Sequence, residues 1–160
     1  MPKTSLESGQ VSPDFCLPNQ EGNQICLENF KGQWAVLFFY PRDNTPGCSL
    51  EARSFSDLKK DFEAENAIIL GVSRDGKESH RKFIEKKELK ITLLSDEKAE
   101  IHEKYDVMHP KNFRGNEVIS TVRTTFLINP EGKIEKVWNN VKAAGHAEKV
   151  LSELKTLKGK

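Results

Sequence analysis

The sequence has 160 residues, about the length of one domain, since a single hydrophobic core usually serves roughly 100 to 200 residues. Leu, Ile, Val and Phe together make up roughly a quarter of the chain, which is above the level at which chains remain disordered. The formal net charge is only +1, which excludes strong attraction to nucleic acid or to an anionic membrane surface. We therefore predict one domain over residues 1–160, with neither nucleic acid nor a membrane as a partner.

The apolar stretches and the cysteines indicate the compartment. The longest wholly apolar stretch, Trp34 to Tyr40, is far shorter than the ~20 residues of a membrane helix, and the first residues do not resemble a signal peptide. We expect a cytoplasmic protein. Three cysteines are an odd number for such a chain, which favours at least one free thiol over a disulfide scaffold.

The first part of the chain predicts a hairpin, a buried strand and a helix. Residues 14–17 and 24–27 alternate in polarity around the turn formers of 19–22, as the two strands of a hairpin do. Residues 34–40 are continuously apolar, which is typical of a strand buried on both faces. From Cys48 to about Ala64 the apolar side chains recur every three to four positions, which places them on one face of a helix.

The middle of the chain alternates between short apolar runs and helical patterns. We predict strands at 67–72 and 92–94 and helices at 77–87 and 97–105. Residues 109–116 contain Pro and Gly with little apolar content, so we expect a long irregular loop there.

The end of the chain predicts a second hairpin and a closing helix. Residues 118–128 and 133–138 flank a predicted type I turn. Apolar residues from Val150 to Leu157 line one face of the last helix, which runs into a lysine-rich tail from about residue 156. The whole order of elements predicts an α/β fold, with a mixed central sheet covered by helices on both faces.

The chemistry is expected at Cys48, which lies where a buried strand gives way to a helix. Unpaired N–H groups and the helix dipole favour negative charge at a helix N-terminus, so the thiolate, the nucleophilic form, is favoured there. Thr45 supplies a hydroxyl three residues earlier, and Pro46 and Gly47 suit a tight turn. The spacing alone leaves open that Cys48 is an ordinary small apolar residue and that Thr45 only caps the helix.

The pattern Pro-x-x-x-Thr-x-x-Cys, here Pro41, Thr45 and Cys48, resembles the active-site signature of the peroxiredoxins. The longer run Tyr-Pro-x-Asp-x-Thr-Pro-Gly-Cys is similar to the bacterioferritin comigratory protein, or PrxQ, branch of that family. Three further segments are similar to family landmarks, and these are residues 13–15, 123–128 and 145–147.

This resemblance implies a thioredoxin-like fold, which here would carry the predicted N-terminal β-hairpin, and a cysteine-dependent peroxidase. We expect no cofactor and no metal. Its substrates would be hydrogen peroxide and organic hydroperoxides. Cys48 would be the peroxidatic nucleophile, Pro41 would shield it from water, and Thr45 would hydrogen-bond the peroxide.

The resemblance also implies that Arg123 is the arginine paired with the cysteine, with Glu51 as its acidic partner and Gly47 in support. A guanidinium suits this role, because it stays charged and presents its donors in a fixed fork where the O–O bond breaks. The alternatives are that Arg123 lies on a solvated strand face and that Glu51 is an exposed helical glutamate.

The sequence departs from the family at the resolving cysteine. Many members of the branch carry it five residues after the peroxidatic cysteine, where this chain has Arg53. Cys16 and Cys26 lie upstream on one face of the predicted hairpin and could face each other. We favour the interpretation that these two cysteines only occupy positions that polar residues could fill, rather than forming a redox pair. We expect neither of them to resolve the oxidised Cys48.

We therefore expect a one-cysteine mechanism, in which the Cys48 sulfenic acid is reduced by an external thiol donor such as thioredoxin. The protein would be a monomer or a weak homodimer. Two other function classes are a thioredoxin-like disulfide reductase, which the lack of Cys-x-x-Cys disfavours, and a non-catalytic binding module on the same fold.

The histidines predict no metal site. His102 and His109 are seven residues apart and His80 is far upstream, and none has a cysteine or carboxylate at metal-ligand spacing. We expect His146 to help begin the last helix without a catalytic role.

Overall fold

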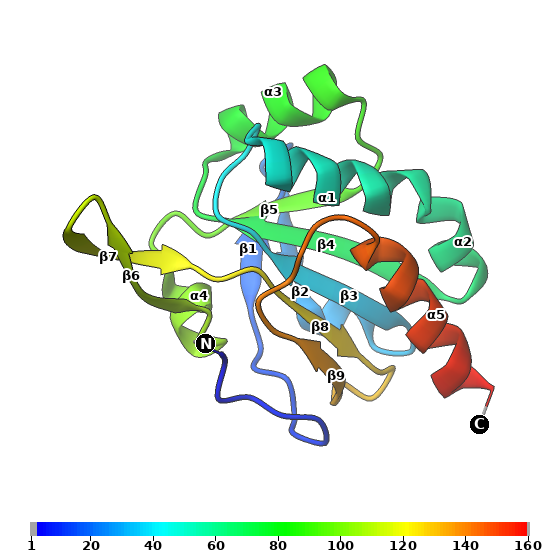
Figure 1. The fold of residues 1–160 in the computed structure, drawn as a ribbon. Coiled ribbons are helices and arrows are strands. Elements are labelled where there is room, and N and C mark those ends of the chain that lie inside the picture. The colour runs from blue at the N-terminus through cyan, green and yellow to red at the C-terminus, as the bar shows by residue number, and fades with distance from the viewer. Residues whose placement is uncertain (1–2, 160) are drawn as a thin grey trace.

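The structure is a computed structural model that describes residues 3–159 (Figure 1). A five-stranded sheet with the order β5-β4-β3-β8-β9 forms its centre. In chain order its strands are β3 (Trp34–Phe39), β4 (Ala67–Ser73), β5 (Thr92–Ser95), β8 (Thr124–Ile128) and β9 (Ile134–Trp138). The strands β3, β4 and β5 run parallel, whereas β8 pairs antiparallel with both β3 and β9. The predicted mixed sheet is confirmed.

Strand β3 is the central strand, and both of its faces are covered. Its residues from Ala35 to Phe39 are almost fully buried. Because side chains alternate across a strand, Val36 and Phe38 enter one apolar cluster and Leu37 and Phe39 enter another. The sheet therefore separates two hydrophobic cores.

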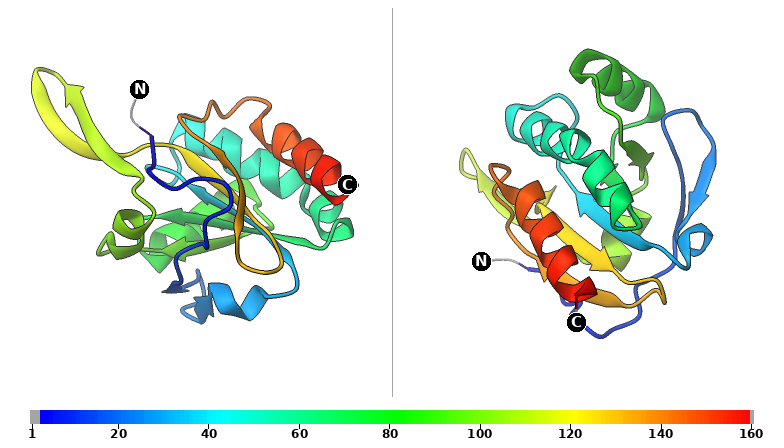
Figure 2. Two further views of the ribbon diagram at one scale, coloured as in Figure 1. Left: turned by 90° about the horizontal axis from the view of Figure 1, so that it is seen from below. Right: turned by 90° about the vertical axis from the view of Figure 1, so that its right-hand side faces the viewer.

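The helices α1 (Pro46–Asp57), α2 (Lys59–Ala64), α3 (Lys77–Lys87) and α5 (His146–Lys158) supply the first core. Helix α4 (Glu100–Lys104) and the N-terminal hairpin supply the second, on the opposite face (Figures 1 and 2). The single helix predicted over residues 48–64 is two helices, because Leu58 leaves helical geometry between them. The lysine-rich tail predicted from residue 156 begins inside α5, which continues to Lys158, and Lys160 lies outside the described residues.

The predicted N-terminal hairpin is present as β1 (Cys16–Pro18) and β2 (Gln24–Cys26), followed by the short 3₁₀ helix η1 (Leu27–Phe30). Cys16 and Cys26 are directly opposed and form a disulfide, with 4.0 Å between their Cα atoms. The expectation of two unpaired cysteines is therefore wrong.

The ladder explains this disulfide. The N–H of Leu27 donates to the carbonyl of Phe15, and the N–H of Asn19 donates to that of Asn23. Cys16 and Cys26 therefore lie at a non-hydrogen-bonded position, where opposed side chains approach most closely. Among the described residues the one free thiol is that of Cys48.

The prediction of a long loop over residues 109–116 is wrong. This segment belongs to a hairpin of β6 (Met108–Phe113) and β7 (Asn116–Thr121), which projects from the body of the protein (Figures 1 and 2). Its two-residue turn has positive φ angles of 52° at Arg114 and 81° at Gly115, which is the geometry that a tight hairpin turn requires. The strand predicted over 118–128 is accordingly two strands, β7 and β8, with residues 122–123 between them.

The carboxyl ends of the parallel strands mark the edge of the sheet where a site is expected. The carboxyl ends of β3, β4 and β5 meet at one edge of the sheet, and the loop from Tyr40 to Thr45 begins there and leads into α1. In open α/β sheets this edge is where ligands usually bind. No helix among residues 3–159 is long and apolar enough to cross a membrane.

Candidate active site

Cys48 is the third residue of α1, at the junction of strand and helix that the sequence predicts. Thr45 precedes the helix with an extended backbone (φ −94°, ψ 155°), and Pro46 is the first helical residue. The N–H of Ser49 donates to the carbonyl of Thr45 at 2.8 Å. The N–H groups of Gly47 and Cys48 precede that bond and have no carbonyl partner within the helix. The first turn of α1 therefore presents backbone donors beside the thiol.

The Cys48 thiol is buried. The residue is 1% exposed and packs in the core with Tyr40, Ala52 and Phe55. The thiol is therefore shielded from bulk solvent in this structure. Pro41, which was expected to shield Cys48, is exposed, and it lines the same surface pocket as Arg123.

The structure brings Arg123, Glu51 and Gly47 together at the first turns of α1. Arg123 lies just before β8, and its Nη1 donates to Oε1 of the buried Glu51 at 3.1 Å. A Cβ built on Gly47 would lie 2.6 Å from Nη2 of Arg123. The guanidinium therefore packs directly on the glycine next to Cys48.

Glu51 is buried beneath this guanidinium. Burial raises the pKa of Glu51 from 4.5 to about 7, although the charge and hydrogen bond of Arg123 act in the opposite direction. Its Oε2 atom has no hydrogen-bond partner within residues 3–159. Glu51 therefore titrates near neutral pH, and its ion pair with Arg123 is complete only above that range.

Thr45 uses its side chain within the loop. Its Oγ1 donates to the carbonyl of Arg42 at 2.9 Å and does not cap α1. Because a hydroxyl has one proton to donate, Thr45 must exchange this bond before it donates to another acceptor.

A second group of polar residues, which the sequence analysis missed, holds this loop. Asp43 is buried, and its carboxylate accepts hydrogen bonds from Tyr40, Ser79 and His80. Burial first, and then the Asp43 charge, raise the pKa of Tyr40 well above its ordinary value of 10.0, so the phenol keeps its proton. Asp43 and His80 are 37 residues apart, and no local pattern in the sequence pairs them.

Two further histidines, His102 and His146, are far from Cys48 in the sequence. His102 pairs with the buried Asp96 at 2.7 Å. Burial, and then the charge of Lys149, lower the pKa of His146 to about 4, and its Nε2 lies 2.8 Å from the hydroxyl of Thr125. Within the described residues no three His, Cys, Asp or Glu side chains form a group that could hold a metal ion.

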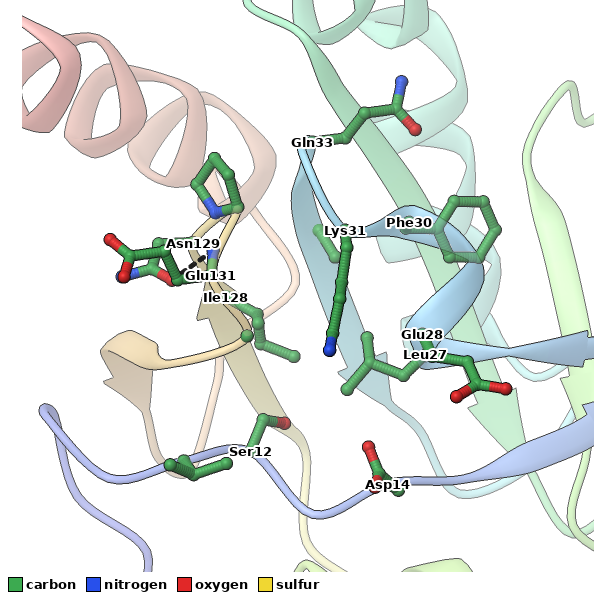
Figure 3. A pocket seen from close by; sticks show the side chains of 14 residues that line it. Ser12, Asp14, Leu27, Glu28, Phe30, Lys31, Gln33, Ile128, Asn129 and Glu131 are labelled. Carbon is green, nitrogen blue, oxygen red and sulfur yellow. Dashed lines mark hydrogen bonds between the residues drawn. The ribbon is translucent and has the colours of Figure 1, made fainter.

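Of two pockets in the structure, one is lined by predicted site residues and the other is not. One of about 580 Å³ lies beside Arg123, between the β6–β7 hairpin and residues 140–142, with Pro41 and Val122 in its wall. A smaller one of about 180 Å³ lies at the other end of β3, where Ser12, Asp14 and Lys31 line it (Figure 3). None of the predicted site residues lines the smaller cavity.

The chain resembles known proteins over nearly its whole length. The model of the AhpC/TSA family matches residues 8–137. The chain belongs to this family. Peroxiredoxin Bcp of Bacillus subtilis is 40% identical over 156 residues, which cover 98% of this chain and 99% of that protein. Peroxidase activity follows from this membership, as does the peroxiredoxin fold.

Solved structures of peroxiredoxins agree with the fold. A variant of Xylella fastidiosa PrxQ superposes with a TM-score of 0.93 at 38% identity, and the match covers 98% of this chain and 99% of that one. The bacterioferritin comigratory protein of Xanthomonas campestris, studied for alkyl peroxide reduction, gives a TM-score of 0.88 at 38% identity, covering 94% of this chain and 98% of that one. The PrxQ-like branch expected from residues 40–48 is confirmed.

Proposed function

We propose that this peroxiredoxin reduces hydrogen peroxide and organic hydroperoxides with Cys48 as its nucleophile. The observation that carries the proposal is the position of the Arg123 guanidinium, packed on Gly47 and bonded to Glu51 in the same first turns of α1 that hold the free thiol. A fixed cation and N–H groups without a helical partner thus belong to the turns of α1 that carry Cys48, where a peroxidase reaction would develop negative charge.

The reaction proceeds in two stages. The Cys48 thiolate attacks one peroxide oxygen, so an S–O bond forms, the O–O bond breaks, and the leaving alkoxide or hydroxide takes a proton to become alcohol or water. The resulting sulfenic acid is then attacked by an external thiol, which releases water and forms a mixed disulfide. A second thiol cleaves that disulfide and restores Cys48.

The separation of the sulfur atoms by the sheet supports an external reductant. Cys48 belongs to the core beneath α1, whereas the residues flanking Cys16 and Cys26 pack into the core on the opposite face. Position 53, where a resolving cysteine is common in this branch, is an exposed arginine that bonds Asp57. We therefore propose a one-cysteine cycle that thioredoxin or a small thiol completes, in a cytoplasmic monomer or weak homodimer.

One experiment tests the class and the nucleophile together. We expect one equivalent of peroxide to consume the Cys48 thiol of the parent protein, and we expect Cys48→Ser to leave peroxide unconsumed. With a thiol donor the parent should turn over peroxide and should not reduce insulin. Insulin reduction without peroxide consumption would identify a disulfide reductase, and an inert Cys48 would identify a binding module.

A further inference from the structure

The loop that leads into α1 is held by one buried residue. Among residues 41–45 only Asp43 is buried, and it lies two residues before Thr45 and five before Cys48. The other four residues of the loop are exposed or half-buried. The position of the loop therefore depends on what Asp43 contacts.

Asp43 is fully engaged from three directions. Its Oδ1 accepts from the hydroxyl of Tyr40 at 2.6 Å, and its Oδ2 accepts from Ser79 Oγ at 2.8 Å and lies 2.7 Å from Nδ1 of His80. Its own N–H donates to the carboxylate of Asp75 at 2.7 Å. The loop is thus tied to the end of β3, to α3 and to the segment after β4.

His80 is the buried end of this network. It is fully buried, and its Nε2 lies 3.0 Å from the carbonyl oxygen of Leu94 while its Nδ1 faces Asp43. Both ring nitrogens therefore face acceptors. Through these two contacts the ring joins the Asp43 carboxylate to β5.

A buried pair of polar side chains such as Asp43 and His80 is poor evidence for stability, because the cost of desolvation offsets much of their attraction. We propose that His80 is a positioning residue for the peroxidase reaction, acting through Asp43 to hold the loop that places Thr45 and Cys48. This inference rests on the proposed role of Cys48. A displacement of only about 1 Å can lower the rate of a positioned reaction about 100-fold.

The chain contains a matched control for this pair. His102 and Asp96 are also 2.7 Å apart, and both side chains are as buried as those of His80 and Asp43. His102 packs its ring edge-on against Phe39, in the core on the opposite face of the sheet from Cys48. Substitution of His102 therefore removes the same kind of contact without touching the loop.

Two amide substitutions distinguish the roles of the two hydrogen bonds of His80. In His80→Asn the amide nitrogen lies close to the place of Nδ1 and keeps the bond to Asp43, whereas in His80→Gln it lies close to the place of Nε2 and keeps only the bond to Leu94. The measurements are the rate constant for Cys48 oxidation by hydrogen peroxide and the melting temperature, for both variants, His102→Gln and the parent.

We expect His80→Gln to react about 10- to 100-fold more slowly than the parent, and His80→Asn to recover much of that loss. His102→Gln should lose stability but keep the parent rate. Equal rates in the parent and His80→Gln, equal losses in the two His80 variants, or an equal loss in His102→Gln would each overturn the inference.

If His80→Gln does not fold, Ser79→Ala decides the matter, because it removes a donor to the same oxygen of Asp43 from a half-buried position. We expect a slower reaction, and a parent-like rate would overturn the inference. A parent protein whose Cys48 does not react with peroxide would overturn the proposed function as well. If the parent reacts with peroxide and its variants react equally fast, only the proposed role of His80 is overturned.

Discussion

The guanidinium of Arg123 occupies the space that a side chain at Gly47 would need, since a Cβ there would lie 2.6 Å from Nη2. The same guanidinium donates to Glu51 one turn further along α1. Cys48 lies between these two contacts in the sequence. The arginine, although 72 residues from Glu51 in the chain, is thus fixed to the helix turn that carries the thiol.

Gly47→Ala should separate activity from stability. The added methyl group meets the flexible end of Arg123, so the side chain moves aside and the fold loses little. We expect the rate of Cys48 oxidation by peroxide to fall about 10- to 100-fold because the guanidinium is displaced. Gly76→Ala is the control, because its new Cβ would lie 3.4 Å from the Glu97 side chain, and it should keep the parent rate. A parent-like rate in Gly47→Ala would show that Arg123 need not lie there.

Arg123→Ala should slow the reaction of Cys48 with peroxide by about 100- to 1000-fold, the usual cost of losing one donor to developing charge. Arg123→Lys should not restore the full rate, because the ammonium lacks the planar fork. Stopped-flow measurement of peroxide oxidation checks both variants, and circular dichroism checks the fold. Arg53→Ala, which removes an exposed arginine, is the control. The assignment of Arg123 fails if its alanine variant reacts as fast as the parent.

Glu51 should make stability depend on pH near neutrality. Its pKa is about 7 in the folded protein and 4.5 ordinarily, so between these values the folded state holds more protons than the unfolded state. The stabilising contribution of the bound proton is complete below pH 4.5 and is lost as the pH rises through 7.

Relative to Glu51→Gln, the parent should therefore lose up to about 3 kcal/mol of unfolding free energy over this range. Urea denaturation of both proteins at several pH values measures the difference. A constant difference, or one that grows in favour of the parent as the pH rises, would contradict the assignment.

Removal of the hairpin disulfide should affect stability more than turnover. The loop between Cys16 and Cys26 has a sequence separation of 10, and closing a loop of this size contributes up to about 3 kcal/mol in the chain-entropy model. The double substitution of both residues by Ser should lower the melting temperature. Turnover of peroxide with a small thiol should stay near that of the parent.

Peptide mapping of the oxidised monomer provides the decisive measurement for the same disulfide. After peroxide treatment without a thiol, we expect Cys48 as sulfenic acid, as sulfinic acid with excess oxidant, or linked between two chains. The bond between Cys16 and Cys26 should remain intact. A stoichiometric link from Cys48 to either hairpin cysteine would establish an in-chain resolver and refute the one-cysteine cycle.

Local patterns in the sequence were sufficient to predict the helices and strands that have buried faces. Residues 34–40 are apolar throughout because both faces of β3 are covered, and the pattern after Cys48 has helical spacing because one face of α1 packs on the sheet. Cys48 at the strand-to-helix junction followed from those two predictions. Burial imposes a period on the sequence, and the period can be read from it.

The features that were missed lack such a period or depend on distant partners. The β6–β7 hairpin projects from the body, so its exposed faces carry no alternation of apolar and polar residues, and Gly115 in its tight turn was the available signal. The pairing of Asp43 with His80 depends on α3 packing beside the loop. The disulfide depends on hydrogen-bond register, which places Cys16 and Cys26 at a close pair.

The projecting hairpin joins the body at a narrow neck, where the N–H of Val122 donates to the carbonyl of Val107 at 2.7 Å. His109 and Lys111 on this hairpin line the pocket of about 580 Å³, and Arg123 of the body lines it as well. Insertions or deletions at the tip, residues 114–115, would therefore lengthen or shorten the projecting strands without passing through any strand of the central sheet. Such changes would leave the contacts of Arg123 with Glu51 and Gly47 in place, because those contacts lie in the body of the protein.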